Sequence, residues 1–468
     1  MRLPPGFLDT LRAAVGDGWV RVDAEALDQY SVDGLKRISR RPDVVVVPGS
    51  TPEVAAVAHA CDDARVPLVP RGAGTGYTGG ALPVRGGVVL SMERFTRILE
   101  IDEDNLLAVV EPNVVTGDLQ DAVERVGLFY PPDPASLRQS VLGGNVAECA
   151  GGPRAFKYGT TRQYVLGLEV VLPTGEIVRT GGRTVKNVAG YELTQLLVGS
   201  EGTLAIITKI VLRLIPRPPA RLALRATFAT IADCARAVTE VVRERVVPAA
   251  LELVDRESLQ AAANHLGQHT LAPAGTEGML LIEVDGLAPA VEEEARRVEA
   301  ACRRAGAIDL VRAANERERE ALWEVRRALS DALKTLARLK LNHDVVVPKG
   351  RVPELFALIA ALRESHRLRI ACFGHAGDGN IHVNMMVNPD DSDEVARAHE
   401  AEWRLFEGVI ALQGAITGEH GVGITKARFL PLGTSVEELA LMRRVKQAFD
   451  PNGILNPGKI FPDEVDDS

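Results

Sequence analysis

A run of glycine residues between two short apolar segments constrains the fold of this chain more than any other feature. The apolar segments, 66–69 and 87–91, have the β-branched composition of buried strands. Between them, residues 74–79 match the spacing Gly-x-Gly-x-x-Gly of dinucleotide-binding folds. A Rossmann site also needs a helix at the third glycine, whereas Leu82-Pro83 and another strand follow here. The run therefore predicts a loop whose bare amides bind a diphosphate, with a Rossmann site or a purely structural turn as alternatives.

The first half of the chain alternates β-branched runs with amphipathic segments. Val44–Val47 predicts a buried strand, and Ser50 or Thr51 caps a helix that runs to about Ala64 with Pro52 in its first turn. A second glycine-rich section spans Gly143–Gly159. Further strands are predicted at 166–172 and 204–214.

The composition changes after a proline-rich segment at 216–219, which predicts a linker. Residues 220–365 are rich in Ala, Arg and Glu with helical periodicity, and strands are predicted near 278–284 and 341–347. Residues 370–425 are rich in glycine and histidine, and a last helix begins near Val436. The chain is therefore expected to have an α+β fold with more than one domain.

The bulk properties limit the function. A length of 468 residues predicts two or three domains. The net charge of −9 and the lack of a basic run argue against nucleic acid as a partner. Five cysteines without a Cys-x-x-Cys pair predict free thiols rather than an iron–sulfur cluster or a zinc ribbon. The sequence has no signal-peptide or membrane-spanning pattern, so a cytoplasmic protein is expected, docked at the inner membrane only through a partner.

The end of the chain contains a glycine spacing that resembles a phosphate-binding loop. Gly453, Gly458 and Lys459 fit this pattern, but Ile460 replaces the Ser or Thr that would hold magnesium. We interpret the match as a coincidence.

Histidines and a carboxylate cluster late in the sequence. His375 and His382 flank a short polar segment, and Glu419 and His420 lie between two glycines. Imidazole and carboxylate groups are ligands of first-row metals, and three of them with open positions favour a catalytic site. The alternative is that these histidines are ordinary core or surface residues.

Arg326 lies in a segment dense in Arg and Glu, which favours a solvated helix face. The alternative is functional, because a guanidinium can hold a substrate carboxylate with two parallel hydrogen bonds.

Taken together, these motifs resemble the FAD-linked oxidase family of the vanillyl-alcohol oxidase, or PCMH, type. Within it they are similar to the D-lactate, glycolate and D-2-hydroxyglutarate dehydrogenases. The motifs that carry the resemblance are Pro70–Gly76, Gly143–Asn145, Tyr158–Thr161, Val198–Leu204, Gly374–His382, Gly418–Gly421 and Asn456–Lys459.

The resemblance implies a two-part FAD-binding domain at 1–218, an α+β cap domain for substrate and metal at 219–430, and a C-terminal segment at 431–468 that returns to the first domain. FAD is expected to be non-covalent, because the loop 71–80 has no histidine to anchor it. The residues implied in FAD binding are Pro70, Arg71, Gly72, Ala73, Gly74, Thr75, Gly76, Gly79, Pro132, Gly143, Gly144, Asn145, Gly152, Tyr158, Gly159, Glu201, Gly202, Ile206 and Asn456.

The resemblance also implies a reaction. His375, His382 and Glu419 match the ligands of a divalent metal, zinc or manganese, and His420 matches the base. Arg326 and Asn384 match substrate-contacting positions. The expected reaction is metal-assisted oxidation of a small 2-hydroxy acid, with hydride transfer to flavin N5. Electrons would pass to an electron-transfer flavoprotein, cytochrome, quinone, oxygen or iron–sulfur subunit.

One departure from the family pattern bears on the substrate. Hydroxyglutarate enzymes carry a Lys where this chain has Asn342, two residues before Asp344, although Lys340 is on the same side of the strand. D-Lactate, glycolate, a bulkier 2-hydroxy acid and D-2-hydroxyglutarate therefore stay open. The chain could act alone, as a homodimer, or as the flavin subunit of a larger glycolate oxidase-like complex. An ether-lipid synthase is disfavoured because its run of consecutive histidines is absent, and the four residues of the metal and base set argue against a non-catalytic subunit.

Overall fold

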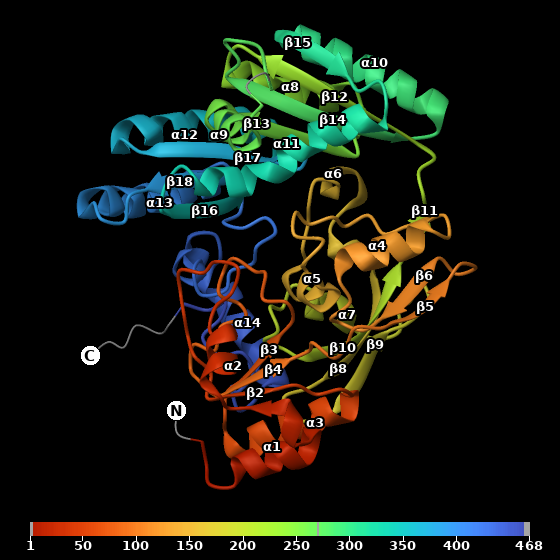
Figure 1. Ribbon diagram of the computed structural model, residues 1–468, viewed down its shortest axis with the longest axis vertical. Coiled ribbons are helices and arrows are strands. Elements are labelled where there is room, and N and C mark those ends of the chain that lie inside the picture. Colours follow the sequence, from red (N-terminus) through yellow and green to blue (C-terminus); the bar gives the residue numbers. More distant parts are fainter. Residues whose placement is uncertain (1–2, 269–270, 463–468) are drawn as a thin grey trace. The chain divides into compact units, whose positions relative to one another are not determined.

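The computed structural model describes residues 3–268 and 271–462, and these residues form two compact units (Figure 1). The first unit contains the residues up to Gly151, Thr160–Arg217 and the residues from Glu419 onward. The second unit contains Gly152–Gly159 and Pro218–Gly418. The chain therefore passes between the units several times.

A four-stranded sheet forms one part of the first unit, in the order β1-β2-β4-β3. Its parallel strands β2, β4 and β3 follow the valine-rich runs of the sequence. Helices α1 and α3 pack beside one another, and their apolar faces share a core with these strands. The elements are α1 (Phe7–Val15), β1 (Val20–Arg21), α2 (Ala24–Gln29), β2 (Val44–Val46), α3 (Thr51–Ala64), β3 (Leu68–Arg71) and β4 (Val88–Ser91).

The capping residues explain where α3 begins. The Ser50 hydroxyl accepts a hydrogen bond from the backbone N–H of Glu53, and the Glu53 carboxylate accepts one from the N–H of Gly49 at 2.7 Å. Ser50 is therefore the N-cap of the helix. Pro52 fits in the first turn, because the backbone N–H that proline lacks would have no partner within the helix at that position. The predicted helix is confirmed at both ends.

Strand β3 begins two residues later than predicted. The backbone N–H of Val66 donates to the carbonyl of Cys61 at 2.9 Å, so Val66 closes the turn that follows α3 and is not part of the strand. The strand instead continues through Pro70 to Arg71. Proline is tolerated there because β3 lies at the edge of its sheet.

A five-stranded antiparallel sheet in the order β5-β6-β10-β8-β9 forms the other part of the first unit. The predicted strands at 166–172 and 204–214 correspond to β8 and β10. The short pair β7 and β11 includes Pro216, so the proline-rich linker begins inside a strand. The elements are β5 (Ile98–Asp102), β6 (Leu107–Val110), α4 (Thr116–Glu124), β7 (Leu128–Phe129), α5 (Leu142–Glu148), β8 (Val165–Val171), β9 (Ile177–Gly181), α7 (Leu193–Leu197), β10 (Ile206–Arg213), β11 (Ile215–Pro216) and α14 (Val436–Phe449).

The second unit is built on a seven-stranded antiparallel sheet in the order β15-β12-β14-β13-β17-β18-β16. Helices α9 and α11 lie side by side and share an apolar core with β13, β14, β17 and β18 (Figure 1). The elements are α6 (Ala155–Tyr158), β12 (Ala220–Phe228), α8 (Ile231–Arg243), β13 (Ala250–Asp255), α9 (Arg256–Leu266), β14 (Gly278–Gly286), α10 (Ala288–Arg304), β15 (Ala307–Arg312), α11 (Glu316–Lys334), β16 (Leu339–Val346), α12 (Val352–His366), β17 (Arg369–His375), β18 (Asn380–Val387) and α13 (Ser392–Ala411).

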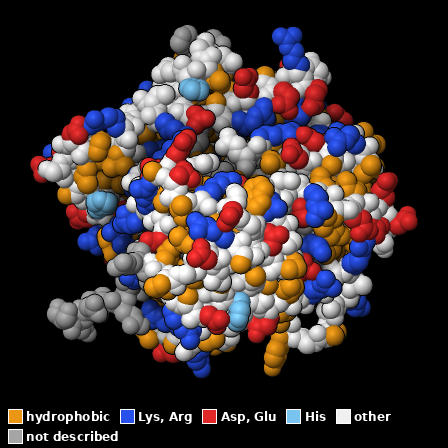
Figure 2. All heavy atoms as spheres, turned by 60° about the horizontal axis from the view of Figure 1, so that its bottom comes forward, with side chains coloured by type: hydrophobic (Ala, Val, Ile, Leu, Met, Phe, Trp, Pro, Cys, Tyr) orange, Lys and Arg blue, Asp and Glu red, His pale blue; other side chains and the backbone are white. Residues whose placement is uncertain are grey.

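The surface charges, the cysteines and the helices can be compared with the expectations from the sequence. On the face drawn in Figure 2, Lys and Arg side chains are interspersed with Asp and Glu. All five cysteines are free. Among the residues that the structure describes, no helix is both long and apolar enough to cross a bilayer.

Candidate active-site residues

The glycine-rich loop follows β3 directly and reaches β4 without a helix, as the sequence predicts. Two of its glycines are required by packing. A Cβ on Gly72 would lie 2.6 Å from Val141, and Gly74 has a φ of +67° with a Cβ position 2.2 Å from the Arg71 guanidinium. A Cβ on Gly76, in contrast, would meet no atom within 4 Å. The loop is therefore held by its first glycines, while the backbone at Gly76 is open to a ligand.

Arg71 fastens this loop to the segment before β2. Its side chain is buried, and its guanidinium donates to the carbonyls of Val32, at 2.8 Å, and Tyr30, at 3.4 Å. Burial lowers the pKa of Arg71. A guanidinium committed to backbone carbonyls fixes the loop conformation, and its contact with a cofactor stays a prediction.

Segments distant in the sequence meet beside the loop. Asn456 donates its side-chain amide to the carbonyls of Gly80, at 2.9 Å, and Glu201, at 2.8 Å. A Cβ on Gly202 would lie 3.0 Å from Pro70. Four residues that the sequence assigned to one cofactor site, Pro70, Glu201, Gly202 and Asn456, are thus brought together.

The predicted residues 143–145 lie in the first turns of α5 rather than in a loop. Gly143 packs against Pro112, whereas a Cβ on Gly144 would have no neighbour closer than 3.9 Å. The Asn145 amide donates to the Thr116 hydroxyl at 2.7 Å. Gly144, like Gly76, is thus a glycine that the packing of the protein does not require.

The remaining predicted cofactor residues are distributed over both units. Pro132 accepts a hydrogen bond from Gln120 at 2.9 Å, and Ile206 begins β10, both in the first unit. Gly152, Tyr158 and Gly159 belong to the second unit, where the Tyr158 hydroxyl donates to Asp285 at 2.8 Å. The role of these three residues in cofactor binding stays a prediction.

Glu201 holds the segment that follows His420. Its carboxylate accepts hydrogen bonds from the backbone N–H groups of Val422 and Gly423, each at 2.7 Å. The ring of Tyr77 lies against the ring of His420, with centroids 5.4 Å apart. The predicted base is therefore carried on a segment of the first unit that is fixed by buried hydrogen bonds. Glu419 lies in the same unit, and a Cβ on Gly151 would lie 2.9 Å from its carboxylate.

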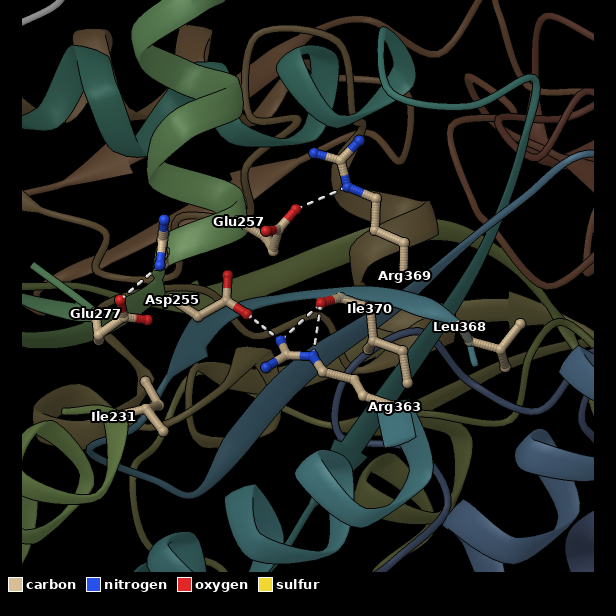
Figure 3. Close-up of a pocket in the computed structure, with 9 residues that line it drawn as sticks. Ile231, Asp255, Glu257, Glu277, Arg363, Leu368, Arg369 and Ile370 are labelled. Carbon is tan, nitrogen blue, oxygen red and sulfur yellow. Dashed lines mark hydrogen bonds and ion pairs between the residues drawn. The ribbon is translucent and has the colours of Figure 1, made fainter. Parts of the chain in front are cut away.

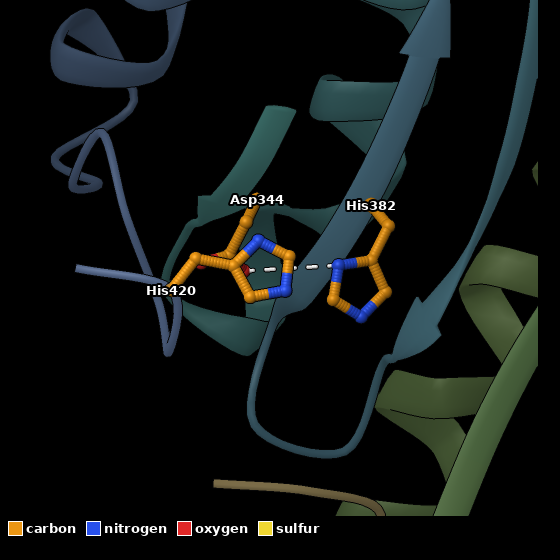
Figure 4. A group of neighbouring side chains, drawn as sticks. All are labelled: Asp344, His382 and His420. Carbon is orange, nitrogen blue, oxygen red and sulfur yellow. Dashed lines mark ion pairs between the residues drawn. The ribbon is translucent and has the colours of Figure 1, made fainter. Parts of the chain in front are cut away.

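The two histidines of the second unit lie on paired strands and not in the polar segment between them. His375 ends β17 and His382 lies in β18, with ring centroids 5.4 Å apart. On β16, Asp344 lies directly opposite His382, and Nδ1 of His382 is 3.8 Å from the Asp344 carboxylate (Figure 4). Residues directly opposite one another in a sheet point to the same face, so these side chains share one face.

Glu252 is the residue of this face that the sequence analysis missed. Its carboxylate is fully buried on β13 and accepts hydrogen bonds from Nδ1 of His375, at 2.7 Å, and from Nε of Arg326, at 2.5 Å. Burial alone would raise the pKa of Glu252, but the adjacent Arg326 and His375 lower it to about 2. The only sequence signal was an acid inside the apolar run 249–254, which says nothing about its partners.

Arg326 is buried at 5% exposure, so the solvated-face interpretation of this residue is wrong. Its guanidinium also stacks 4.8 Å from the ring centroid of Phe373. Among the residues that the structure describes, its two Nη groups have no hydrogen-bond acceptor. The two Nη groups, which could hold a carboxylate, therefore make no hydrogen bond that stabilises the fold.

Asn384 is fully buried beside these residues. Its amide donates to the carbonyls of Ala371 and His382, and its oxygen accepts from Asn342 at 2.7 Å. Because both amide hydrogens are used, Asn384 has only its oxygen left to offer a substrate. Lys340 lies further along β16 and donates to Ser330.

A cavity elsewhere in the second unit contains none of the predicted residues. It has a volume of about 280 Å³ and is lined by three arginines, three acids and three aliphatic side chains (Figure 3). The charges pair as Arg363 with Asp255, Arg256 with Glu277, and Arg369 with Glu257. These ion pairs neutralise the cavity and leave no net charge to attract a ligand.

Comparison with known proteins identifies the family. The model of the FAD binding domain matches residues 42–181, and the model of the C-terminal domain of FAD linked oxidases matches residues 217–460. The chain belongs to the FAD-linked oxidase family and is an oxidoreductase that binds FAD.

Individual relatives are similar over nearly their whole length. The chain is 43% identical to glycolate oxidase subunit GlcD of Bacillus subtilis, covering 92% of each protein. It is 37% identical to D-lactate dehydrogenase of Anaerostipes hadrus, covering 90% of each. Among solved structures, p-cresol methylhydroxylase matches with a TM-score of 0.81 at 19% identity, covering 98% of this chain and 97% of the other. The predicted fold class, a PCMH-type FAD-binding domain with an α+β cap, is confirmed.

Proposed function

We propose that this chain oxidises a small 2-hydroxy acid, of the size of D-lactate or glycolate, to the 2-oxo acid. The observation that carries the proposal is one face of the seven-stranded sheet in the second unit. Arg326, His375, His382 and Asn384 lie close together there, and the Nη groups of Arg326 make no hydrogen bond to the described residues. A guanidinium beside imidazoles suits a substrate that has a carboxylate next to a hydroxyl. The names of the relatives, glycolate oxidase subunit and D-lactate dehydrogenase, support the same class of substrate.

The first unit would hold FAD without a covalent bond. Gly76 and Gly144 suit this role, because at both positions a Cβ would occupy open space that a close-approaching cofactor needs. When bound, FAD supplies the two-electron acceptor, with N5 receiving the hydride. The protein contributes the shape of the site and the orientation of the substrate.

The proposed metal ligands are His375, His382 and Glu419, with zinc or manganese as the ion. The donor set fits, because His375 gives its Nδ1 hydrogen to Glu252, an arrangement common for imidazoles that bind metal through Nε2. Gly418, directly before Glu419, donates its N–H to Asp344 at 3.0 Å, so the chain leads toward this part of the sheet. A divalent ion there would lower the pKa of the substrate hydroxyl.

The side chains divide the remaining tasks. Arg326 would hold the substrate carboxylate through its Nη groups, and Asn384 could accept one hydrogen bond through its oxygen. His420 would take the hydroxyl proton as general base, because a neutral imidazole has a ring nitrogen that can accept a proton.

An alternative is that the chain is the flavin subunit of a multi-subunit glycolate oxidase-like complex. The observation that favours it is the name of several relatives, glycolate oxidase subunit GlcD. Electrons would then leave through an iron–sulfur or other partner subunit rather than an electron-transfer flavoprotein, a cytochrome, a quinone or oxygen. D-2-hydroxyglutarate is a further candidate substrate, but Asn342 is engaged with Asn384 where a lysine would be expected.

Anaerobic bleaching of the flavin tests the proposal. The purified protein should be yellow and release intact FAD on acid precipitation. Its 450-nm band should bleach with D-lactate or glycolate, and poorly with the matching alcohols that lack a carboxylate. Failure of every D- and L-2-hydroxy acid to bleach the flavin would contradict the proposed substrate class, and colour that stays with the precipitate would contradict non-covalent binding.

A further inference from the structure

We infer that Glu252 is a positioning residue that fixes His375 and Arg326 together in the orientations needed for metal and substrate. The inference rests on the proposed function of these two residues. It goes beyond that function because Glu252, on β13, is not itself assigned to metal or substrate and acts through His375 on β17 and Arg326 on α11.

The geometry gives each carboxylate oxygen a separate task. Oε1 accepts from Nδ1 of His375 on the neighbouring strand β17, and Oε2 accepts from Nε of Arg326 on helix α11. The residue is fully buried, so water does not compete for either oxygen. Hydrogen bonds to a buried carboxylate are stronger than those between neutral groups. One side chain therefore links a strand residue and a helix residue that are far apart in the sequence.

The contact with His375 selects one form of its ring. An ionised carboxylate can only accept, so Nδ1 must carry the hydrogen. The lone pair of the neutral ring then lies on Nε2, the atom that would coordinate a metal. Loss of the Glu252 charge removes this selection and allows the ring to rotate or to change tautomer.

The contact with Arg326 directs the other end of that residue. Since Nε is bound to Glu252 and the central carbon of the guanidinium lies over the ring of Phe373, the guanidinium has little freedom to turn. Its Nη groups are thereby oriented for a bidentate partner before substrate arrives. Such preorganisation reduces the entropy lost on binding.

The chain contains a matched control for a purely structural role. Glu283, on β14, is also buried and accepts from Arg319, at 3.0 Å, and from Trp323, at 2.7 Å. Both pairs fasten α11 to the sheet through a buried carboxylate. Only the partners of Glu252 are assigned to metal and substrate. A comparison of the two sites therefore distinguishes a role in positioning those residues from a role in holding α11 to the sheet.

The test compares Glu252→Gln with Glu283→Gln in the flavin-loaded, full-length protein. Glutamine keeps the shape but has a single acceptor oxygen, so at least one partner loses its hydrogen bond. We expect Glu252→Gln to weaken Zn²⁺ binding, measured by competition with a chelator, by roughly tenfold to a hundredfold. It should also raise KM for the 2-hydroxy acid with unchanged FAD content. Glu283→Gln should lower Tm to a similar extent without changing Zn²⁺ affinity or KM.

Two further measurements keep the outcome decisive. The ¹⁵N shifts of the His375 ring should report hydrogen on Nδ1 in the wild type and a mixture in Glu252→Gln. Glu252→Asp, which keeps the charge but shortens the side chain, should show intermediate effects if the glutamine variant does not fold. Unchanged tautomer, Zn²⁺ affinity and KM, together with a lower Tm, would reduce Glu252 to a structural residue. If the wild type binds Zn²⁺ but no 2-hydroxy acid bleaches the flavin, the proposed function fails while the effect on His375 is still measured.

Discussion

Thr78 and His420 are 342 positions apart in the sequence, and the hydroxyl of Thr78 donates to the carbonyl of His420 at 3.1 Å. The backbone carbonyl of Thr78 also accepts from the N–H of Ile424 at 2.8 Å. The glycine-rich loop that includes Gly76 is thus joined directly to the segment that carries the proposed base. The same hydrogen bonds therefore fix the position of the loop assigned to the cofactor and of the segment assigned to proton transfer.

Thr78→Val tests whether this connection orients His420. Valine has the same shape without the hydroxyl, and the lost hydrogen bond should cost about 1 kcal/mol of stability. Because His420 loses its anchor, substrate-driven flavin reduction in stopped flow should slow several-fold with unchanged FAD content. Thr208→Val is the matched control, since Thr208 is equally buried and donates to the carbonyl of Glu169. An equal slowing in both variants would show that general destabilisation is the cause.

The sequence was sufficient for elements with strong local signals. Helix α3 was predicted from Ser50 or Thr51 to about Ala64, close to its observed bounds, because Ser50, Pro52 and Glu53 determine its start without help from distant residues. Strand β3 was displaced because its limits depend on pairing with β4, which local composition does not encode. The order of the strands in each sheet and the placement of Gly152–Gly159 in the second unit depend on contacts between distant segments and could not be derived.

The candidate site divides in the same way. Histidines beside glycines were visible as a pattern, although their strand positions were not. Glu252 was not visible, because its partners lie 74 and 123 residues away and its position inside an apolar strand looks like ordinary alternation. Burial of Arg326 was also missed, since a helix dense in charges does not show which charge faces the sheet.

Arg326→Lys tests the proposed hold on the substrate carboxylate. Lysine keeps the charge but cannot donate to Glu252 and at the same time present a two-pronged donor to a substrate. We expect kcat/KM for the 2-hydroxy acid to fall by roughly tenfold to a thousandfold, with FAD content unchanged. Steady-state kinetics with the acid and with its amide measure this, and the amide should lose less. Equal losses for both substrates would assign Arg326 to packing.

Lys340 predicts a pH dependence of stability. Burial and the nearby Lys334 lower its pKa from 10.5 to about 8. Between pH 8 and 10.5 the unfolded chain binds more protons at this site than the folded one, so the contribution of Lys340 to stability rises with pH. Lys340→Met should therefore resist urea better than the wild type at pH 7. This advantage should be smaller at pH 9.5. A difference between the two proteins that stays constant with pH would show that Lys340 titrates normally.

The last prediction separates the metal from the base, because adjacent residues are assigned different tasks. If Glu419 is a ligand, Glu419→Gln should lower metal occupancy, and excess divalent cation should partly restore the rate. If His420 is the base, His420→Asn should keep the metal and slow flavin reduction by roughly a hundredfold or more. The pH profile of kcat/KM should also lose the rising limb that the wild type owes to its general base.

The positions of the two side chains in the first unit are consistent with this division. The ring of His420 lies on Tyr77, while a Cβ on Gly151 would meet the carboxylate of Glu419, so different parts of the unit surround the two residues. Metal analysis by mass spectrometry decides between the assignments. Loss of metal from His420→Asn with full occupancy in Glu419→Gln would show that the two roles are reversed, because a ligand retains its ion only while its own donor atom is present.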